Sequence, residues 1–509
     1  MSGAIRAPLW EPLSGASLVL LTIALPLATF MQVVDTTIAN VAVQTISGNL
    51  GASSSQGTWV ITSYSVANAI MLPLSGRLSQ RFGEKRLFLW STALFSTASM
   101  ACGLSQDLNT LVFFRIIQGA VGGPMIPLAQ SLLMNNYPRE KQVMALALWS
   151  MTISVAPVFG PIMGGYISDN FHWSWIFFIN APIGVIVVAL ASGVLAGRET
   201  KISHPRWSGL SFALLAIGVG AFQITLDLGK DLDWFNSPTI RLISLIAILG
   251  LCFLLIWEKD NPNALIDLTL FKHRNFSVGI SLISFGMMLY LGTVVLIPLL
   301  LQTRYGYTAT WAGLATAPIG ILPVIMLPII GRYSNHIDMR YIISGGFAVI
   351  ALTMSLRTGF APGMDIEYVL IPQFLQGIGL ACFFVPITSL AFIGMDPTKI
   401  AGASGVYNCS RALFSAIGTS VFTTLWERRE AFHHVRLTGH IDALNPLVTE
   451  GLERLTALGM SEEQALGYMA NQITNQGFIM AANEIFQVCS YSFLFMILLV
   501  WLAKPKKNM

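Results

Sequence analysis

Long apolar runs recur along the whole chain and are separated by short polar segments. A helix needs about 20 apolar residues to cross the hydrocarbon core of a bilayer. The runs are continuous and do not alternate apolar with polar positions, as the strands of membrane barrels do. The pattern predicts an all-α integral membrane protein with 14 transmembrane helices, at approximately 17–39, 58–76, 87–104, 110–133, 143–167, 175–196, 207–226, 239–257, 277–301, 311–330, 341–358, 369–392, 400–425 and 477–502.

Composition agrees with this pattern. Of the 509 residues, 54% are hydrophobic and only 11% are charged, whereas soluble proteins carry about 25% charged residues. A soluble globular protein is therefore excluded. The five cysteines all lie in apolar runs and show none of the spacings typical of metal ligands. We expect them to be packing residues, and we expect neither a metal nor a cofactor.

Lysine and arginine predict the orientation in the membrane, because short cytoplasmic loops carry an excess of both. Alternate loops hold 19 of these residues on one side of the membrane and 8 on the other. Half of the 8 lie in one long segment, 426–475, and the other four, Lys230, Arg241, Arg304 and Arg357, are assigned to short loops. An even number of crossings places both termini on the same side. The sequence therefore predicts that both termini are cytoplasmic and that 426–475 is a periplasmic loop.

An internal repeat divides the chain. The segment that begins Gly76-Arg77 is echoed 255 residues later at Gly331-Arg332, and Gln118-Gly119 is echoed 258 residues later at Gln376-Gly377. Parallel repeats of this kind build one large class of transporters. We predict a six-helix bundle in residues 1–200, two intervening helices and a cytoplasmic linker in 201–274, and a second six-helix bundle in 275–509 that includes the loop 426–475.

Asp35 lies inside the first apolar run, where a charge costs at least about 2.5–3.5 kcal/mol. Gln32, Asp35 and Thr36 fall at positions i, i+3 and i+4 and share one helix face. A carboxylate that is protonated in one state and ionised in another is suited to couple a proton gradient to transport. A permanent structural ion pair is the alternative.

Two arginines also lie inside apolar runs. Arg115 shares a helix face with Gln118, and Arg411 shares one with Asn408. Arginine stays charged in proteins, so Arg115 needs a partner, and Asp35 is the candidate by chemistry; backbone carbonyls are the alternative. Gln373 and Gln376 are polar groups in another apolar run. With Gln32, Thr36, Gln118, Asn408 and Arg411 they are candidates for a substrate cavity, although such groups also join helices.

Small residues and prolines form a strip in the fifth run, at Pro157, Gly160, Pro161, Gly164 and Gly165. Small residues let two helices approach closely, and each proline removes a backbone hydrogen bond where a hinge can form. Any close helix crossing would use the same residues.

The segment 426–475 is too polar to cross a membrane. Ser461 and Gln464 form a capping-box pattern, and Leu466, Met469, Ala470 and Ile473 follow at helical spacing. An earlier stretch ends at Gly459. We expect two short amphipathic helices. Their apolar faces either dock a partner protein or pack on the protein's own helices or the membrane interface.

Several motifs resemble those of the major facilitator superfamily. Gly160 to Gly165 resembles its antiporter motif, Arg115 to Gly119 its fourth-span motif, and the loop with Gly76, Arg77, Arg81 and Gly83 its cytoplasmic hinge motif. Gln80 and Glu84 depart from the hinge motif, where the family usually has Asp and often has Arg. Asp35 to Ala42 and Trp173 to Asn180 resemble signatures of its fourteen-span drug/proton antiporters.

This resemblance covers essentially the whole chain and implies the major facilitator fold. It also implies a proton-driven exporter of hydrophobic toxic compounds in a bacterial inner membrane, with Asp35 and Arg115 in proton coupling. It further implies two partners, a periplasmic adaptor of the membrane-fusion type and an outer-membrane channel of the TolC type.

Two other functions stay open. A transporter of a specific metabolite or siderophore would share the fold, which does not define the substrate. A membrane enzyme acting on lipid-linked substrates would need clustered His, Asp or Glu, whereas four of the histidines, His172, His204, His273 and His336, are scattered singly. No G-x-x-x-x-G-K-S/T segment is present, which argues against an ATP-driven pump. We therefore expect a transporter and not an enzyme.

Overall fold

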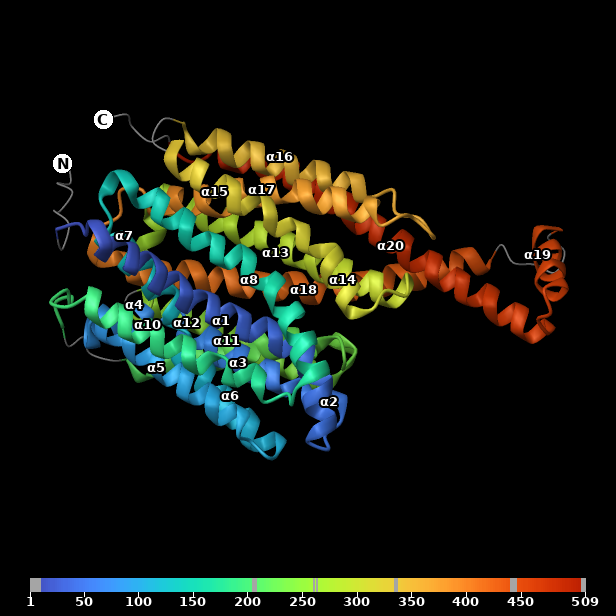
Figure 1. Cartoon of the computed structure of the whole chain (residues 1–509), viewed down its shortest axis with the longest axis horizontal. Helices are drawn as coiled ribbons and strands as arrows, with labels where there is room; N and C mark the ends of the chain where they lie inside the picture. The colour runs from blue at the N-terminus through green and yellow to red at the C-terminus, as the bar shows by residue number, and fades with distance from the viewer. Residues whose placement is uncertain are drawn as a thin grey trace.

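The computed structural model describes residues 11–203, 208–259, 261, 264–333, 337–439 and 446–504. Within these ranges the chain forms helices and no strand (Figure 1). A helix lies over every predicted span. The first half contains α1 Gly15–Asn49, α2 Ser54–Gly57, α3 Trp59–Met71, α4 Ser75–Phe82, α5 Glu84–Gly103, α6 Leu108–Gly122, α7 Met125–Asn136, α8 Gln142–Asn170, α9 Trp175–Phe178 and α10 Asn180–Val194.

Two helices follow the first half, and eight more complete the described part of the chain. The two intervening helices are α11 Gly209–Gly229 and α12 Pro238–Lys259. The second half contains α13 Arg274–Arg304, α14 Ala309–Thr316, α15 Ile321–Tyr333, α16 Met339–Arg357, α17 Glu367–Phe392, α18 Ile400–Thr438, α19 Pro446–Ala457 and α20 Glu462–Val500.

Ten helical segments within the described ranges are long and apolar enough to cross a membrane. The predicted spans 58–76, 87–104, 143–167 and 400–425 are helical too, but they are not among the ten. They are represented by α3, α5, α8 and α18. The ten are Gly15–Asn40, Leu108–Asn136, Trp175–Val194, Gly209–Gly229, Pro238–Lys259, Arg274–Arg304, Thr310–Tyr333, Met339–Arg357, Glu367–Phe392 and Glu462–Val500.

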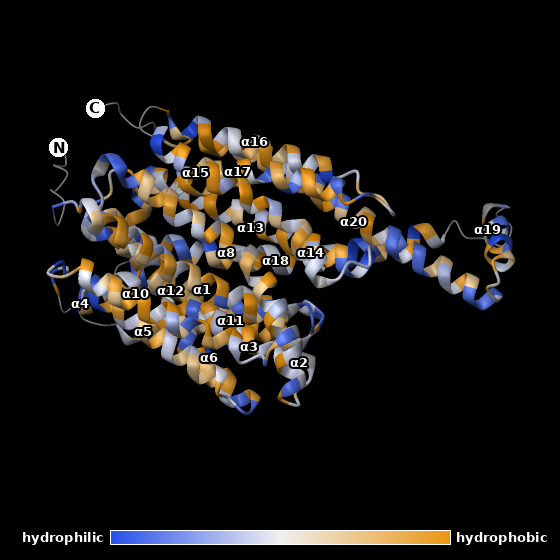
Figure 2. Cartoon of the chain, in the orientation of Figure 1, coloured by the Kyte–Doolittle hydropathy of each residue, from blue (hydrophilic) through white to orange (hydrophobic). Residues whose placement is uncertain are grey.

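Hydrophobic residues occur along the length of the bundle helices (Figure 2). Many large ones are exposed, for example Trp90, Val185, Ile256 and Leu498, each at 65% or more. In water such a surface would be unfavourable, because soluble proteins rarely expose large apolar patches. In lipid it is the expected surface, so the protein is a multi-pass membrane protein.

The two halves pack closely at the end of the bundle where α1 begins and α20 ends, here called the terminal end. A Cβ atom added to Gly76 on α4 would lie 2.4 Å from the Cα of Gly402 on α18, and one added to Gly405 would lie 2.6 Å from the carbonyl oxygen of Leu72. Only glycine permits these backbone approaches. The halves are therefore in direct backbone contact there.

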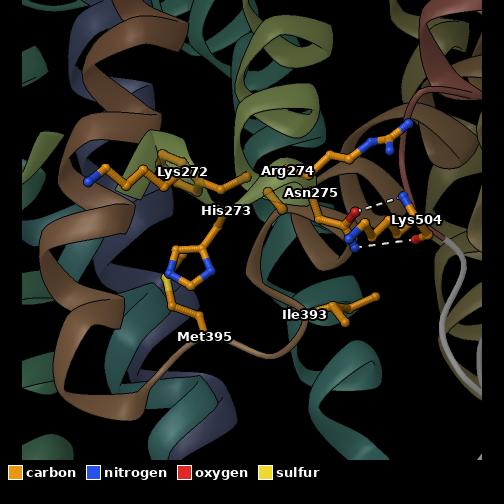
Figure 3. A pocket seen from close by; sticks show the side chains of 9 residues that line it. Lys272, His273, Arg274, Asn275, Ile393, Met395 and Lys504 are labelled. Carbon is orange, nitrogen blue, oxygen red and sulfur yellow. Dashed lines mark hydrogen bonds between the residues drawn. The ribbon is translucent and has the colours of Figure 1, made fainter. Parts of the chain in front are cut away.

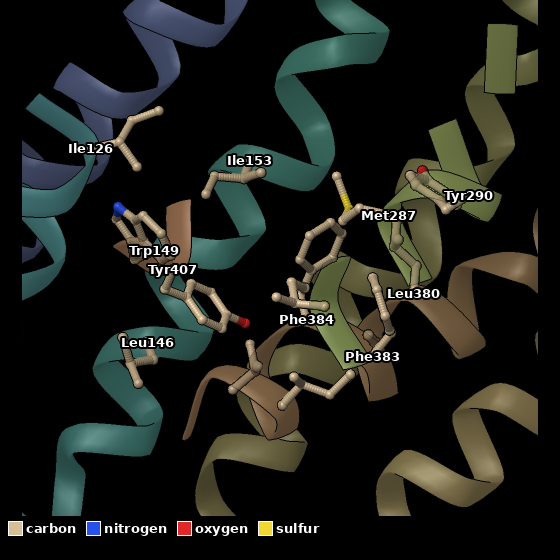
Figure 4. Close-up of a cluster of buried hydrophobic side chains, with 14 of the residues drawn as sticks. Ile126, Leu146, Trp149, Ile153, Met287, Tyr290, Leu380, Phe383, Phe384 and Tyr407 are labelled. Atoms are coloured by element: carbon tan, nitrogen blue, oxygen red, sulfur yellow. The ribbon is translucent and has the colours of Figure 1, made fainter. Parts of the chain in front are cut away.

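Apolar and aromatic side chains fill the contact between the halves (Figure 4). Trp149 and Ile153 of α8 belong to the same buried cluster as Met287, Phe384 and Tyr407 from the second half. Polar groups also lie there. Trp149 Nε1 donates to Thr29 Oγ1 at 3.0 Å, the Tyr407 hydroxyl lies 2.9 Å from that of Thr388, and Gln130 Nε2 is buried without a hydrogen-bond partner among the described residues.

An arm projects from the opposite end of the bundle (Figure 1). It consists of the last part of α18 from Trp426, α19, and the first part of α20 as far as Phe478. The rings of Trp426 and Phe478 are in tilted contact with centroids 4.7 Å apart, and Arg429 forms a bidentate ion pair with Glu484 at 2.6 and 2.9 Å. These contacts join α18 to α20 at the base of the arm.

The arm corrects the expectation of two separate short helices in 426–475. The earlier stretch does form a separate helix, α19, and the Ser461–Gln464 capping box is present at the start of the next one. That next helix is not short, however. It continues from Glu462 to Val500 without interruption, and this stretch contains no proline to remove a backbone hydrogen bond.

Candidate functional site

Asp35 lies on α1 in the interior of the first half and is only 2% exposed. Its carboxylate accepts three hydrogen bonds. Arg115 donates to Oδ2 at 2.8 Å, and Gln118 and Asn180 donate to Oδ1 at 3.0 and 2.6 Å. A buried carboxylate is tolerated when it is paired and hydrogen-bonded in this way. The predicted pairing of Asp35 with Arg115 is confirmed as a contact.

Arg115 joins α6 to two other helices. Its Nε donates to the carbonyl oxygen of Val60 on α3 at 3.0 Å, and its guanidinium lies over the ring of Tyr64 at 4.2 Å. Its Nη1 also donates to Gln118 Oε1 at 2.8 Å. Both proposed partner types, the carboxylate and a backbone carbonyl, are therefore present together. A planar group with several donors suits this arrangement.

Asn180 at the start of α10 is a site residue that the sequence reasoning did not single out. Its amide donates to Asp35 and also to Ser99 Oγ on α5 at 2.9 Å. Ser99 in turn donates to the carbonyl oxygen of Phe177. The sequence did contain a signal for this residue, because Asn180 is the last residue of the Trp173 to Asn180 motif. The site thus links five helices: α1, α3, α5, α6 and α10.

The antiporter strip packs directly against α1 beside Asp35. A Cβ atom added to Gly160 would lie 1.9 Å from Thr37 Oγ1, and one added to Gly164 would lie 3.3 Å from the carbonyl oxygen of Ile38. Gly165 has no neighbour within 4 Å. The side chains of Pro157 and Pro161 lie outside the described residues. The helix α8 runs unbroken through the strip.

The hinge-motif residues lie at the terminal end. Gly76 meets α18 as described above, and Arg77 Nε donates to the carbonyl oxygen of Ala264 at 2.7 Å. Arg81 is exposed. Gly83 has a φ of +87° and lies against the carboxylate of Glu199, which accepts from the backbone N–H groups of Lys85 and Arg86 at 3.1 and 3.0 Å.

Glu199 and Glu84 explain how the loop tolerates its departures from the family motif. The Glu199 carboxylate binds the first turn of α5, a position where a helix favours negative charge. Glu84 is buried, and Ser131 and Asn135 of α7 donate to its Oε2 at 3.2 and 3.4 Å. Gln80 is exposed and contributes its backbone carbonyl to Ser203. The acidic groups of the region therefore come from Glu84 and Glu199.

The candidate cavity residues occupy three separate places. Gln32, Thr36 and Gln118 lie in the first half around Asp35. Asn408 lies between the halves, where its amide donates to Gln130 Oε1 of α7 at 3.1 Å. Arg411 is on α18, and its Nε has no hydrogen-bond partner among the described residues. Gln373 and Gln376 lie inside the second half.

The second half contains a buried arginine that the charge tally placed in a loop. Arg357, the last residue of α16, is 0% exposed. Its Nη2 donates to the side-chain oxygens of Gln373 and Gln376, the latter at 2.6 Å. The assignment of Arg357 to a loop is wrong, because its side chain turns into the bundle to reach these amides.

The repeat relates this cluster to the Asp35 site. Gln376 follows Gln118 by 258 residues, and Gln373 follows Arg115 by the same number. Each half thus has an arginine bound to the equivalent glutamine, from α6 in the first half and from α16 in the second. No carboxylate joins Arg357 in the described part of the chain. The acid is a feature of one half only.

Comparison with known proteins identifies the class. The Major Facilitator Superfamily model matches residues 25–419, so the chain belongs to this superfamily. Among solved structures, the human organic anion transporter MFSD10 (TETRAN) is similar with a TM-score of 0.59, at 12% identity, over 96% of this chain and 100% of that one. This likeness confirms the predicted major facilitator fold.

Two similar relatives are multidrug export proteins. The chain is 55% identical to the multidrug export protein EmrB of Escherichia coli (strain K12) over 496 residues, which is 97% of each chain. It is 51% identical to the protein of the same name from Haemophilus influenzae (strain ATCC 51907 / DSM 11121 / KW20 / Rd), over 97% of this chain and 98% of that one.

Proposed function

We propose that this protein is a proton-coupled multidrug efflux transporter of a bacterial inner membrane. The export function is supported by the similarity to multidrug export proteins over nearly the whole chain. The coupling is supported by one observation above all, the carboxylate of Asp35 held in the interior of a membrane-embedded bundle by an arginine and two amides.

The proposed topology has fourteen spans with both termini in the cytoplasm. The first bundle is 1–200, the intervening helices and linker are 201–274, and the second bundle is 275–509. The uneven distribution of Lys and Arg between the loops supports this orientation. Arg357 lies in the bundle interior and not in a loop, so it no longer counts toward the side with 8 Lys and Arg. The distribution between the two sides is therefore more uneven. The terminal end then faces the cytoplasm, and the arm faces the periplasm.

The geometry of the Asp35 site supports proton coupling. The ionised carboxylate accepts donors from α6 and α10 and neutralises Arg115. A protonated carboxyl loses its charge, so the buried guanidinium loses its counter-ion, and the attraction between α1 and α6 weakens. The strip around Gly160 places α8 against the same part of α1. A change in protonation therefore changes how α1 packs on two neighbours.

Hydrophobic compounds fit the contact between the halves. Trp149 and Ile153 face Met287, Phe384 and Tyr407 there, and these side chains offer apolar and aromatic surface with few fixed polar groups (Figure 4). Sites that accept many compounds use adaptable apolar surfaces of this kind. A transporter of one polar metabolite would need more polar groups in fixed positions, so broad export is favoured over that alternative.

The arm is the proposed docking site for a periplasmic membrane-fusion adaptor that resembles EmrA, and through it for a TolC-like outer-membrane channel. α19 lies away from the bundle beside the first turns of α20 (Figure 1). Apolar side chains are exposed on the arm, including Val435 at 72% and Leu458 at 78%. A sealed path across the periplasm would stop hydrophobic drugs from re-entering the inner membrane.

Drug susceptibility tests the proposal as a whole. A pump-deficient host that carries this gene should become resistant to several unrelated hydrophobic compounds, and more so when the adaptor is co-expressed. Inverted vesicles should then accumulate drug only when a pH gradient is imposed. Resistance to one compound alone would favour the single-substrate alternative, and uptake without a pH gradient would contradict proton coupling.

A further inference from the structure

A cavity of about 300 Å³ lies at the terminal end of the second half. It is bounded by the start of α13, the turn that follows α17, and the residues that follow α20 (Figure 3). Its lining residues are Lys272, His273, Arg274, Asn275, Phe276, Ala391, Ile393, Met395 and Lys504. None of the lining residues belongs to the Asp35 site.

The charge of the cavity is entirely positive. Lys272, Arg274 and Lys504 carry permanent charge at neutral pH, and none of the lining residues is acidic. Two acids lie close by in the chain or through a contact: Asp338 binds Arg340 at 2.7 Å, and Asp396, which follows Met395, accepts from the backbone N–H and the hydroxyl of Thr398 at 2.9 and 2.7 Å. An anion that binds in this hollow would be attracted by all three cations.

Hydrogen bonds hold two sides of the cavity together. Asn275 Nδ2 donates to the carbonyl oxygen of Lys504 at 3.3 Å, and the backbone N–H of Lys504 donates to Asn275 Oδ1 at 2.8 Å. Arg274 Nε donates to the carbonyl oxygen of Leu502. Figure 3 shows this pairing on one side of the cavity and His273 directed toward Met395 on the other. The position of Lys504 is therefore fixed by the fold.

The other wall of the cavity is apolar and lies at the level where two spans end. Phe276, Ala391, Ile393 and Met395 form this wall. The candidate spans Arg274–Arg304 and Glu462–Val500 begin and end beside it. Phe276, Ala391 and Met395 are buried, at 0%, 2% and 8% exposure, so the cations are the groups that a ligand can reach. Basic sites at the level where spans end are suited to the phosphate groups of anionic phospholipids.

We propose that this cavity binds the phosphate group of an anionic phospholipid from the adjoining leaflet. Lys272 and Lys504 are long and flexible enough to close on a phosphate ester, and Arg274 supplies a planar donor group beside them. A bound headgroup would tie the end of α20 to the start of α13. The assignment of this leaflet to the cytoplasmic side rests on the topology given under the proposed function; the binding itself does not.

Binding is measured on the full-length protein without any drug. The protein is placed in neutral phosphatidylcholine nanodiscs or detergent, phosphatidylglycerol is added, and bound lipid is counted by native mass spectrometry together with the shift in melting temperature. The triple variant Lys272→Gln, Arg274→Gln, Lys504→Gln should bind phosphatidylglycerol at least tenfold more weakly. A triple control, Lys141→Gln, Lys201→Gln, Lys259→Gln, removes three exposed charges from the same end and should bind normally.

Three outcomes overturn the proposal. The first is equal weakening in both triple variants, which would mean that only the overall surface charge matters. The second is complete displacement of phosphatidylglycerol by millimolar inorganic phosphate, which would show that the cavity binds a soluble phosphate compound. The third is no loss in the single variant Lys504→Glu, which alters only the end of the described chain and remains testable when the triple variant does not fold.

Discussion

The Arg115 guanidinium lies 2.8 Å from the Asp35 carboxylate, and neither side chain is exposed by more than 1%. Replacing Asp35 with Asn retains the shape but removes both the charge and the titrating proton. We expect Asp35→Asn to abolish pH-driven drug uptake into inverted vesicles while drug binding survives. Asp231→Asn, at an exposed acid, is the control and should transport normally. Full uptake by Asp35→Asn would contradict the coupling role of Asp35.

Arg115 is expected to act through both its charge and its shape. Lysine retains the charge but cannot reach Asp35, Gln118 and the Val60 carbonyl together, because it lacks the planar fork. Arg115→Lys should therefore keep partial transport, and Arg115→Ala should keep almost none, since Asp35 is then buried without a cation. Transport rates in the same vesicles check this. Equal activity of the two variants would reduce Arg115 to a structural residue.

At the contact between α4 and α18, the same substitution has different steric consequences on the two helices. A Cβ on Gly76 would meet the Gly402 backbone at 2.4 Å, whereas a Cβ on Gly402 meets only Gly76 Cα at 3.8 Å. Gly76→Ala should therefore separate the halves at the terminal end, and Gly402→Ala should not.

The reporter for this separation is Ser404→Cys in a protein without its natural cysteines, because Ser404 is 0% exposed between the halves. Alkylation of this cysteine should be about tenfold faster with Gly76→Ala, which corresponds to a shift of about 1.4 kcal/mol toward the open form. Similar rates with Gly76→Ala and Gly402→Ala would show that the glycine contact does not hold this end closed.

Arg357 is expected to stabilise the second bundle without coupling protons. No carboxylate joins it in the described part of the chain, and its guanidinium donates to the buried side-chain oxygens of Gln373 and Gln376. Arg357→Met leaves these oxygens without a donor, at a cost of about 1–3 kcal/mol each, so it should lower the melting temperature and keep pH-driven transport. Thermal unfolding followed by fluorescence, and the vesicle assay, measure these two properties. Loss of transport in a stable Arg357→Met protein would reveal a coupling charge in the second half.

The arm can be shortened without disturbing the bundle. Replacing residues 440–461 with a Gly/Ser linker removes α19 and leaves α20 intact from Glu462. Drug/proton exchange in vesicles should persist, while resistance in cells and co-purification of the adaptor should be lost. As a control, the same linker in place of the natural residues 204–207 should leave co-purification unchanged. An adaptor that still co-purifies in full yield would place its docking site elsewhere.

Much of the fold was predictable because a continuous apolar run of spanning length forms an α-helix in lipid, where all its backbone hydrogen bonds must be made internally. All fourteen runs are helical. The lengths of α18 and α20 were not predictable from apolarity, since both helices continue into polar sequence. Hydropathy reports where a helix leaves the membrane, and it does not report where a helix ends. The absence of proline through 400–438 and 462–500 was the better signal.

The site was predictable only in part. The cost of a charge in lipid singled out Asp35 and Arg115, but a single sequence cannot show that residues 80 positions apart touch. Asn180 and Ser99 were missed because neutral polar residues in spans carry no such signal. Arg357 was assigned to a loop because it stands at the end of an apolar run, where the first residues of a loop are also found. The spacing of Gln373 and Gln376, which repeats that of Arg115 and Gln118, was the available clue.

The continuity of α18 and α20 makes the arm a mechanical extension of the second bundle. Both helices are 39 residues long and unbroken. Because no hinge interrupts them, a rotation of that bundle would turn the arm by the same angle. The 16 residues of α20 from Glu462 to Gly477 extend about 24 Å at a rise of about 1.5 Å per residue. A rotation of about 15° would displace the far end of this stretch by about 6 Å relative to its base. A protein bound there would be pulled and released once in every transport cycle.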